Sequence, residues 1–277
     1  MRKQLVLIPG RVGAAGDATA LKARWLDALS LGLKRAGLQV PQADVRVAFC
    51  GEIERVDTPS ANELSDNGSA ADIQLEEFRR EVLEEVAGNR DVLDFQPRGI
   101  QTSERIRGLL QALDACDGVN VPLIMQTIDD VHRYLANPTL RAATAERIRE
   151  QVDPNVPAVV VGHALGSVIA YDAISDEKSS SWTISGFVTL GSPLGVGAIR
   201  AMLHGAGMPS NVARWCNARD PSDGAAFFPL DPKHFPVRPP AFILDKSDVS
   251  NRAADHHGVE GYLSDAEIAR WIHFALR

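Results

Sequence analysis

The sequence predicts an α/β fold in which a mostly parallel sheet is flanked by helices. A short apolar run, Leu5–Ile8, is closed by a Pro-Gly turn and is followed by a helical pattern and a second strand pattern, Val45–Phe49. A β-loop-α-β order of this kind favours parallel pairing through a crossover helix. Farther along, Pro157–Val161 is a continuous apolar run, which is typical of a central parallel strand buried on both faces.

Helical regions separate these strands. Apolar residues recur at helical spacing after the first turn, and a glycine supplies the stop: Leu21, Trp25, Leu29, Leu33, Leu38 and Gly37. Between residues 52 and 119, two amphipathic patterns, Ile73–Val86 and Ile106–Leu113, occur with no strand pattern between them. We therefore predict one domain over residues 1–277 that carries a helical lid or insertion at 52–119. A further helical stretch, Ile124–Val152, is interrupted at Asn137-Pro138.

The rest of the sheet and the last helix are predicted from shorter patterns. Three weaker strand candidates follow the central strand: Phe187–Leu190 (or a longer strand from Thr183), Val212–Trp215 and Ala241–Leu244. The chain closes with a helical pattern, Asp265–Leu276, for which Ser264 is the expected N-cap.

The composition argues against several kinds of partner. The 277 residues are 45% hydrophobic and carry a net charge of −7 without a block of Lys and Arg, so no nucleic-acid partner is expected. The cysteines, Cys50, Cys116 and Cys216, are too far apart for a zinc site, and neither a metal nor another cofactor is expected. No apolar stretch approaches the roughly 20 residues of a transmembrane helix, and Leu5–Ile8 is too short for a signal peptide. The expected location is therefore cytoplasmic.

The segment Gly162–Ser167 carries the functional argument. It reads Gly-His-Ala-Leu-Gly-Ser, follows the buried strand and opens a helical pattern. Glycines at 162 and 166 suit a sharp, strained strand-to-helix turn, because larger side chains there would meet neighbouring backbone. Such a turn lifts the side chain of residue 164 above the sheet edge and leaves the Leu165 N–H free at a helix N-terminus.

This string resembles the nucleophile elbow Gly-His-Ser-Leu-Gly-Ser of lipases and esterases, with Ala164 in place of the serine. The resemblance implies an α/β-hydrolase fold, with Ala164 at the nucleophile position and the Leu165 N–H as one donor to an oxyanion. It also implies a second donor just after the first strand, at Arg11 or Val12.

The turn after the first strand departs from the usual form of the family. Pro9 stands where the family often has a histidine, so the choice between the two candidate donors stays open. By the same resemblance, Gly10 in this turn and His163 in the elbow are expected to line the substrate pocket.

An acid and a histidine follow in the order that the hydrolase family requires. Asp223 is the preferred acid because small residues follow it, and Asp220, which precedes a proline and suits a turn, is the alternative. His257 is the preferred base because it lies a few residues before a Tyr-Leu pair that begins at Tyr262, as in family members, and His256 is the alternative. A metal site at the paired histidines is disfavoured, since adjacent residues rarely point at one ion.

Together these residues predict a serine hydrolase that acts on a carboxylic ester of an acyl or lipid compound through a Ser-His-Asp triad. The chain as given is expected to be inactive, because Ala164 has no hydroxyl to attack with. Ser167 lies one helical turn later and is expected to face the packed side. The expected partner is a small-molecule ester, and the sequence does not indicate a protein partner.

Two interpretations of Ala164 compete. It is either an engineered Ser-to-Ala substitution or the mark of a natural pseudoenzyme. A pseudoenzyme would tend to lose more than one element, yet the elbow, a late Asp and a late His are all present, so the engineered interpretation is favoured. The alternative function is a natural non-catalytic binding protein of the same fold. A nucleotide site at Gly10–Gly16 is disfavoured, because the segment has neither the G-x-G-x-x-G spacing nor the Gly-Lys-Ser/Thr ending of a phosphate loop.

Overall fold

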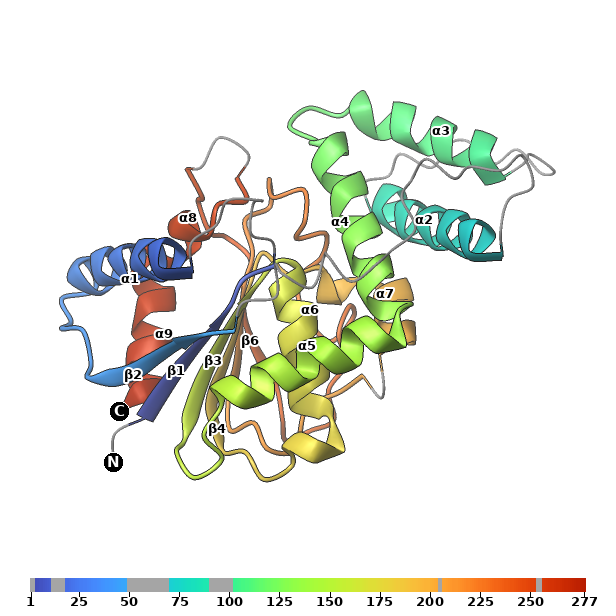
Figure 1. Ribbon diagram of the computed structural model, residues 1–277. Helices are drawn as coiled ribbons and strands as arrows, with labels where there is room; N and C mark the ends of the chain where they lie inside the picture. Colours follow the sequence, from blue (N-terminus) through green and yellow to red (C-terminus); the bar gives the residue numbers. More distant parts are fainter. Residues whose placement is uncertain (1–2, 11–17, 49–69, 90–101, 204–205, 253–255) are drawn as a thin grey trace.

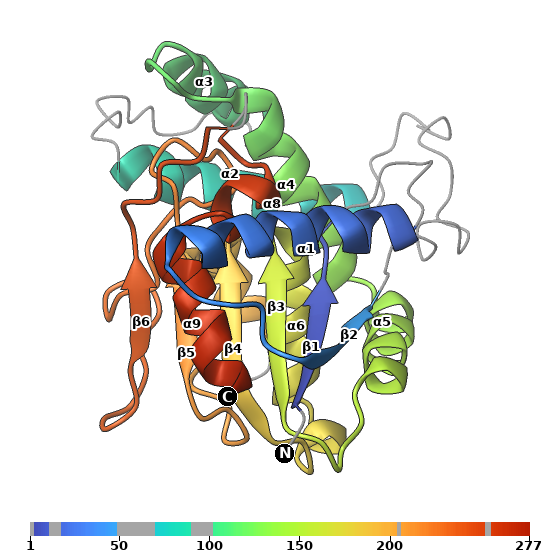
Figure 2. The same cartoon turned by 90° about the vertical axis from the view of Figure 1, so that its left-hand side faces the viewer.

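Six parallel strands form the sheet at the centre of the molecule (Figures 1 and 2). The computed structural model describes residues 3–10, 18–48, 70–89, 102–203, 206–252 and 256–277. The strands lie in the order β2-β1-β3-β4-β5-β6, and every pair is parallel. Their bounds are β1 Lys3–Ile8, β2 Ala43–Val47, β3 Ala158–His163, β4 Ile184–Leu190, β5 Trp215–Ala218 and β6 Ile243–Lys246. The predicted α/β class with a parallel sheet is thus confirmed.

Helices cover both faces of the sheet. Figure 1 shows α1 and α9 on one side, and α5 and α6 on the other. The helices are α1 Ala18–Arg35, α2 Ala70–Asn89, α3 Thr102–Asp114, α4 Val121–Leu135, α5 Pro138–Gln151, α6 Leu165–Ser175, α7 Gly197–Met202, α8 Val259–Leu263 and α9 Ala266–Leu276, with short 3-10 turns at Glu177–Ser179 and Pro193–Gly195.

The apolar run of β3 is buried because it supplies both hydrophobic cores. Val159 and Val161 pack with helices α1, α8 and α9, whereas Val160 packs with the helices of the opposite face. Successive side chains of a strand point to opposite faces, so a strand between two helical layers has no polar side. This explains why the sequence shows a continuous apolar run there rather than an alternating one.

The helical stretch before β3 consists of two helices, and each begins with a capping asparagine and a proline in the first turn. The side chain of Asn120 accepts the Leu123 N–H at the start of α4, and that of Asn137 accepts the Leu140 N–H at the start of α5. Backbone N–H groups in the first turn of a helix have no acceptor within the helix, so a proline, which lacks this N–H, loses no hydrogen bond there. The break predicted at Asn137-Pro138 is confirmed as the boundary between two helices.

An ion-paired network fixes α4 and α5 to α6. Arg141 of α5 donates two hydrogen bonds to the carboxylate of Asp172 on α6, at 2.6 and 3.0 Å, and the hydroxyl of Tyr134 on α4 donates a third at 2.8 Å. These hydrogen bonds raise the pKa of the Arg141 guanidinium. Since α6 begins at residue 165, the network anchors the helix that follows the elbow.

Within the predicted insertion at 52–119, the described segments contain the helices α2 and α3. Figure 1 shows α2 and α3 set apart from the sheet, beside α4. Arg79 of α2 pairs with Asp129 of α4 at 2.7 Å, and both carboxylate oxygens of Glu85 accept the Gly197 N–H at the start of α7. Residues 52–69 and 90–101 lie outside the described part of the chain, and whether the insertion acts as a lid stays a prediction.

The last two strands begin later than their predicted positions. β5 begins at Trp215, whereas Val212, the first residue of the predicted strand, makes only an isolated bridge to Ile184. β6 covers Ile243–Lys246 instead of 241–244. β2 covers Ala43–Val47 instead of the predicted Val45–Phe49, and Phe49 lies outside the described residues.

The predicted N-cap of the last helix is wrong by one residue. Asp265 caps α9, because its side chain accepts the backbone N–H groups of Glu267 and Ile268. Ser264 instead ends α8, a helix that the sequence did not indicate. In the described ranges, no helix combines the length and the apolar character needed to cross a membrane.

Candidate functional site

The turn between β3 and α6 forms a strained elbow at Ala164. Its φ of 51° and ψ of −127° lie where a residue with a side chain is seldom found. The Ala164 N–H donates to the Leu190 carbonyl at 3.0 Å, and the Ala164 carbonyl accepts the backbone N–H and the hydroxyl of Ser167 at 2.9 and 2.5 Å. The neighbouring strand and the first helical turn therefore hold the strained residue in place.

Close backbone approach explains two of the glycines at the elbow. A β-carbon on Gly166 would lie 2.7 Å from the Pro9 carbonyl carbon, and closer still to the Ile8 carbonyl oxygen. A β-carbon on Gly10 would lie 2.7 Å from the His163 carbonyl oxygen and 2.8 Å from the Leu165 nitrogen. The end of β1 therefore lies directly against the elbow.

The proposed oxyanion donors are only partly described. Leu165 is the first residue of α6, and the N–H of that position has no acceptor within its own helix. Gly10, expected to line the pocket, lies against this N–H and against the β-carbon of Ala164. Arg11 and Val12, the two candidates for the second donor, lie outside the described residues.

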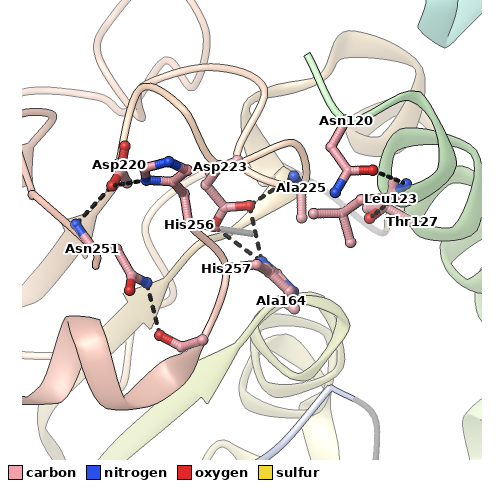
Figure 3. A network of polar contacts seen from close by, with 12 residues as sticks. Asn120, Leu123, Thr127, Ala164, Asp220, Asp223, Ala225, Asn251, His256 and His257 are labelled. Carbon is pink, nitrogen blue, oxygen red and sulfur yellow. Dashed lines mark hydrogen bonds and ion pairs between the residues drawn. The ribbon is translucent and has the colours of Figure 1, made fainter. Parts of the chain in front are cut away.

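A buried carboxylate and an imidazole meet beside the elbow. The Nδ1 atom of His257 lies 2.9 and 3.0 Å from the two carboxylate oxygens of Asp223 (Figure 3). An ionised carboxylate only accepts, so this contact fits the His257 tautomer that carries its hydrogen on Nδ1. The Asp223 side chain has no exposed surface. The Ala225 N–H donates to its Oδ1 at 2.8 Å and the Tyr262 hydroxyl to its Oδ2 at 2.6 Å.

His163 joins this pair to the elbow. Its ring centroid lies 4.7 Å from that of His257, and its Nε2 donates to the His257 carbonyl oxygen at 2.8 Å. Figure 3 shows the His257 ring extending from Asp223 toward Ala164. The structure thus brings together the three residues preferred from the sequence, and it places His163 as a support of the His257 backbone.

The two alternative residues form a separate pair. The Nδ1 atom of His256 lies 3.4 Å from Oδ2 of Asp220, and the His256 side chain is 48% exposed. Asp220 is buried and accepts the backbone N–H groups of Ser222 at 2.8 Å and Asn251 at 2.7 Å. Neither residue is part of the contact between His163 and His257.

Two contributors were missed in the sequence. Tyr262 served there only as a marker of family spacing, yet its hydroxyl donates to Asp223 and accepts the Asp220 N–H at 3.1 Å. Burial raises the pKa of this phenol, so it stays a donor. Ser192 lies 2.6 Å, oxygen to oxygen, from Ser167, which is fully buried as the sequence analysis expected. Both hydrogen bonds join residues far apart in the chain, and no local pattern indicates them.

Because of His163, we expect the folded protein to lose stability as the pH falls. Burial, and the neighbouring His257, lower the pKa of His163 to about 3, below the value of about 6.5 in an unfolded chain. Only the unfolded chain gains this proton between those pH values, so stability is complete above pH 6.5 and falls toward pH 3, by at most about 1.4 kcal/mol per pH unit. Between pH 7 and pH 5, the titration of His163 should lower the free energy of unfolding by about 2 kcal/mol. Urea unfolding at both pH values measures this.

The matched variant is His163→Gln, which keeps a donor near the position of Nε2 but does not titrate in this range. The free energy of unfolding of the parent chain should fall more steeply with acid than that of the variant. Parallel curves for the two proteins would contradict the assignment of the effect to His163.

Comparison of the chain with the profiles of known protein families and with curated proteins gives no match. The resemblance to α/β-hydrolases therefore depends on the elbow string and on the geometry around it. Over the part of the chain that is described, no three His, Cys, Asp or Glu side chains gather where they could hold a metal ion.

Proposed function

We propose that this chain has the scaffold of a serine hydrolase of the α/β-hydrolase kind, acting on a carboxylic ester of an acyl or lipid compound. The observation that carries the proposal is the buried Asp223–His257 pair, 2.9 Å apart, whose imidazole packs on the residue next to the elbow. A buried carboxylate that orients an imidazole beside a strained strand-to-helix turn is the arrangement that such catalysis needs.

With a serine at position 164, each group has a role. The serine oxygen would attack the ester carbonyl carbon while His257 Nε2 takes the hydroxyl proton, and the Leu165 N–H would hold the oxyanion. The imidazolium, stabilised by Asp223, would return the proton to the departing alkoxide and leave an acyl-enzyme. Water would then attack that ester while giving a proton to His257, and His257 would pass the proton to the serine oxygen as its bond to the acyl group breaks, which releases the acid and restores the serine.

Ala164 removes the first step of this sequence. A methyl group offers neither a nucleophilic oxygen nor a proton, so the chain should bind the ester without turning it over. The strained φ and the Asp223–His257 pair are present although no serine uses them. This favours an engineered Ser-to-Ala substitution over a natural pseudoenzyme, since drift would have removed several of these features.

The insertion at 52–119 is proposed as the lid that selects the substrate. A cavity of about 200 Å³ lies between its helix α2, the start of α4 and the loop of Asp223, and its lining includes Val86, Asn120, Ile124 and Phe227. The insertion therefore approaches the acid from the side away from the sheet.

Restoring the hydroxyl tests the proposed function. We expect the Ala164→Ser protein to hydrolyse p-nitrophenyl acyl esters, whereas the parent chain should retain at most the residual rate that remains without a nucleophile, about 10³–10⁴-fold above uncatalysed hydrolysis. A fluorophosphonate should label the variant at position 164, as mapped by peptide mass spectrometry, and should not label the parent. A series of acyl chain lengths would define the substrate.

Matched controls separate this outcome from nonspecific hydrolysis. The double variant Ala164→Ser/His257→Gln should lose both labelling and turnover. A folded Ala164→Ser protein that reacts with no ester and takes up no phosphonate would contradict the enzymatic proposal. It would favour the second candidate, a non-catalytic binding protein, for which Ala164 itself is the supporting observation.

A further inference from the structure

A second aspartate–histidine pair lies directly beside the first. Asp220 precedes Asp223 by three residues, and His256 precedes His257 by one, so the two pairs share the same two loops (Figure 3). The backbone also couples them, because the Asp223 N–H donates to the Asp220 carbonyl at 3.1 Å. Any movement of Asp220 would therefore be transmitted to the carboxylate that orients His257.

The carboxylate of Asp220 is a junction of three chain segments. It is 4% exposed, and it accepts the Ser222 N–H at Oδ1 and the Asn251 N–H at Oδ2, with His256 3.4 Å from Oδ2. One buried carboxylate thus joins the loop of the acid, the segment after β6 and the residue before His257. Hydrogen bonds of N–H groups to a charged acceptor are the stronger kind.

The backbone of His256 explains why adjacent histidines reach different aspartates. Its φ is +57°, in the left-handed region, which changes the direction in which the following side chain leaves the backbone. The His256 ring consequently turns to Asp220 while the His257 ring turns to Asp223. A left-handed non-glycine residue costs on the order of 1 kcal/mol, so the contacts around His256 must hold this conformation.

Asn251 extends the same junction to the other side of His257. It is buried, its N–H is held by Asp220, and its side-chain Nδ2 donates to the Gly258 carbonyl at 2.7 Å. The residues immediately before and after His257 are therefore both tied, directly or through Asn251, to the Asp220 carboxylate.

We propose that Asp220 is a positioning residue that sets the place of His257 by holding His256 on one side and, through Asn251, Gly258 on the other. This inference rests on the proposed function, because it gives the His257 imidazole a base's role. If Asp220 served only to begin a turn before Pro221, its contacts with His256 and Asn251 would not be needed.

A direct measurement on the parent chain tests the positioning without any activity. The Nδ1 proton of His257, hydrogen-bonded to Asp223, should give a slowly exchanging NMR signal downfield of the amide protons. The Asp220→Asn variant places an amide NH₂ group against the Asn251 N–H or the Ser222 N–H, both donors. We expect this variant to lose or broaden the His257 signal. The Asp248→Asn control removes one exposed carboxylate from the same segment and should leave the signal unchanged.

Kinetics in the Ala164→Ser background provide the second measurement. With active sites counted by phosphonate titration, Asp220→Asn should lower kcat per site by about 10- to 100-fold with KM nearly unchanged, the scale expected for misplacing a reacting group by about 1 Å. Asp248→Asn should change kcat less than twofold. A merely structural role would lower the number of titratable sites and the melting temperature but leave kcat per site intact, and that result would overturn the proposal.

Failure of the proposed function would be distinguishable from failure of this inference. If the Ala164→Ser protein were inactive, the NMR comparison would still decide whether Asp220 places His257, and an unchanged signal would overturn the inference. If Asp220→Asn failed to fold, His256→Gln provides the alternative, because its side chain is half exposed. It should broaden the same signal and lower kcat about 3- to 10-fold through the same misplacement, and an unaltered signal would again overturn the proposal.

Discussion

In the Ala164→Ser protein, replacing Asp223 with asparagine should lower kcat by about 10⁴-fold. Each carboxylate oxygen of Asp223 already accepts one fixed donor, the Ala225 N–H at Oδ1 and the Tyr262 hydroxyl at Oδ2. An asparagine would turn its NH₂ group toward one of these donors and leave a single oxygen for all others. His257 would then lose the acceptor that keeps its hydrogen on Nδ1, and its Nε2 could no longer take the serine proton.

The measurement is kcat on one ester, normalised to folded protein by circular dichroism because the variant should label poorly. Asp220→Asn is the matched control, since it makes the same chemical change in the same loop and should cost only the 10- to 100-fold expected for lost positioning. The reverse ranking, with Asp220→Asn losing about 10⁴-fold and Asp223→Asn losing less than tenfold, would assign the acid to Asp220.

The parts of the fold that were predicted from the sequence are those in which local pattern and tertiary role coincide. Pro157–Val161 reads as a central strand because β3 is buried on both faces, and Asn137-Pro138 marks a helix boundary because the asparagine side chain caps α5. β5 and β6 begin later than predicted, since each is only four residues long. In so short a strand the apolar pattern does not define the ends, and pairing with the neighbouring strand decides them.

The candidate site likewise has one part that local sequence determines and one part that depends on contacts between distant residues. The elbow is a local structure, so the string Gly162–Ser167, placed between a buried strand and a helical pattern, was enough to predict it. For the two aspartates and the two histidines, local signals gave a preference, but the pairing itself is not local. It depends on the left-handed φ of His256 and on a hydrogen bond from Tyr262 to Asp223, 39 residues away in the chain. Neither has a sequence signature, and only the folded arrangement relates them.

Among the glycines that the structure describes with backbone close to a new β-carbon, Gly166 should be the most damaging one to replace with alanine, because its nearest backbone contact is the shortest. The new β-carbon would lie 2.7 Å from the Pro9 carbonyl carbon and 2.9 Å from the Gly10 nitrogen, with the Ile8 carbonyl oxygen nearer still. All three are backbone atoms at the end of β1, so no side chain can rotate away and the strand and α6 must separate. We expect a loss of about 3 kcal/mol or more in the free energy of unfolding, at or beyond the upper end of the usual cost of overpacking, measured by urea denaturation.

Gly108→Ala is the matched control for this substitution. Gly108 lies within α3, and a β-carbon there meets nothing within 4 Å, so alanine should stabilise the protein by about 0.5–1 kcal/mol through helix propensity and a restricted unfolded chain. Opposite signs for the same chemical change would show that backbone contact, rather than the loss of glycine, determines the result at Gly166. Equal effects at both positions would mean that β1 does not lie against the elbow as described.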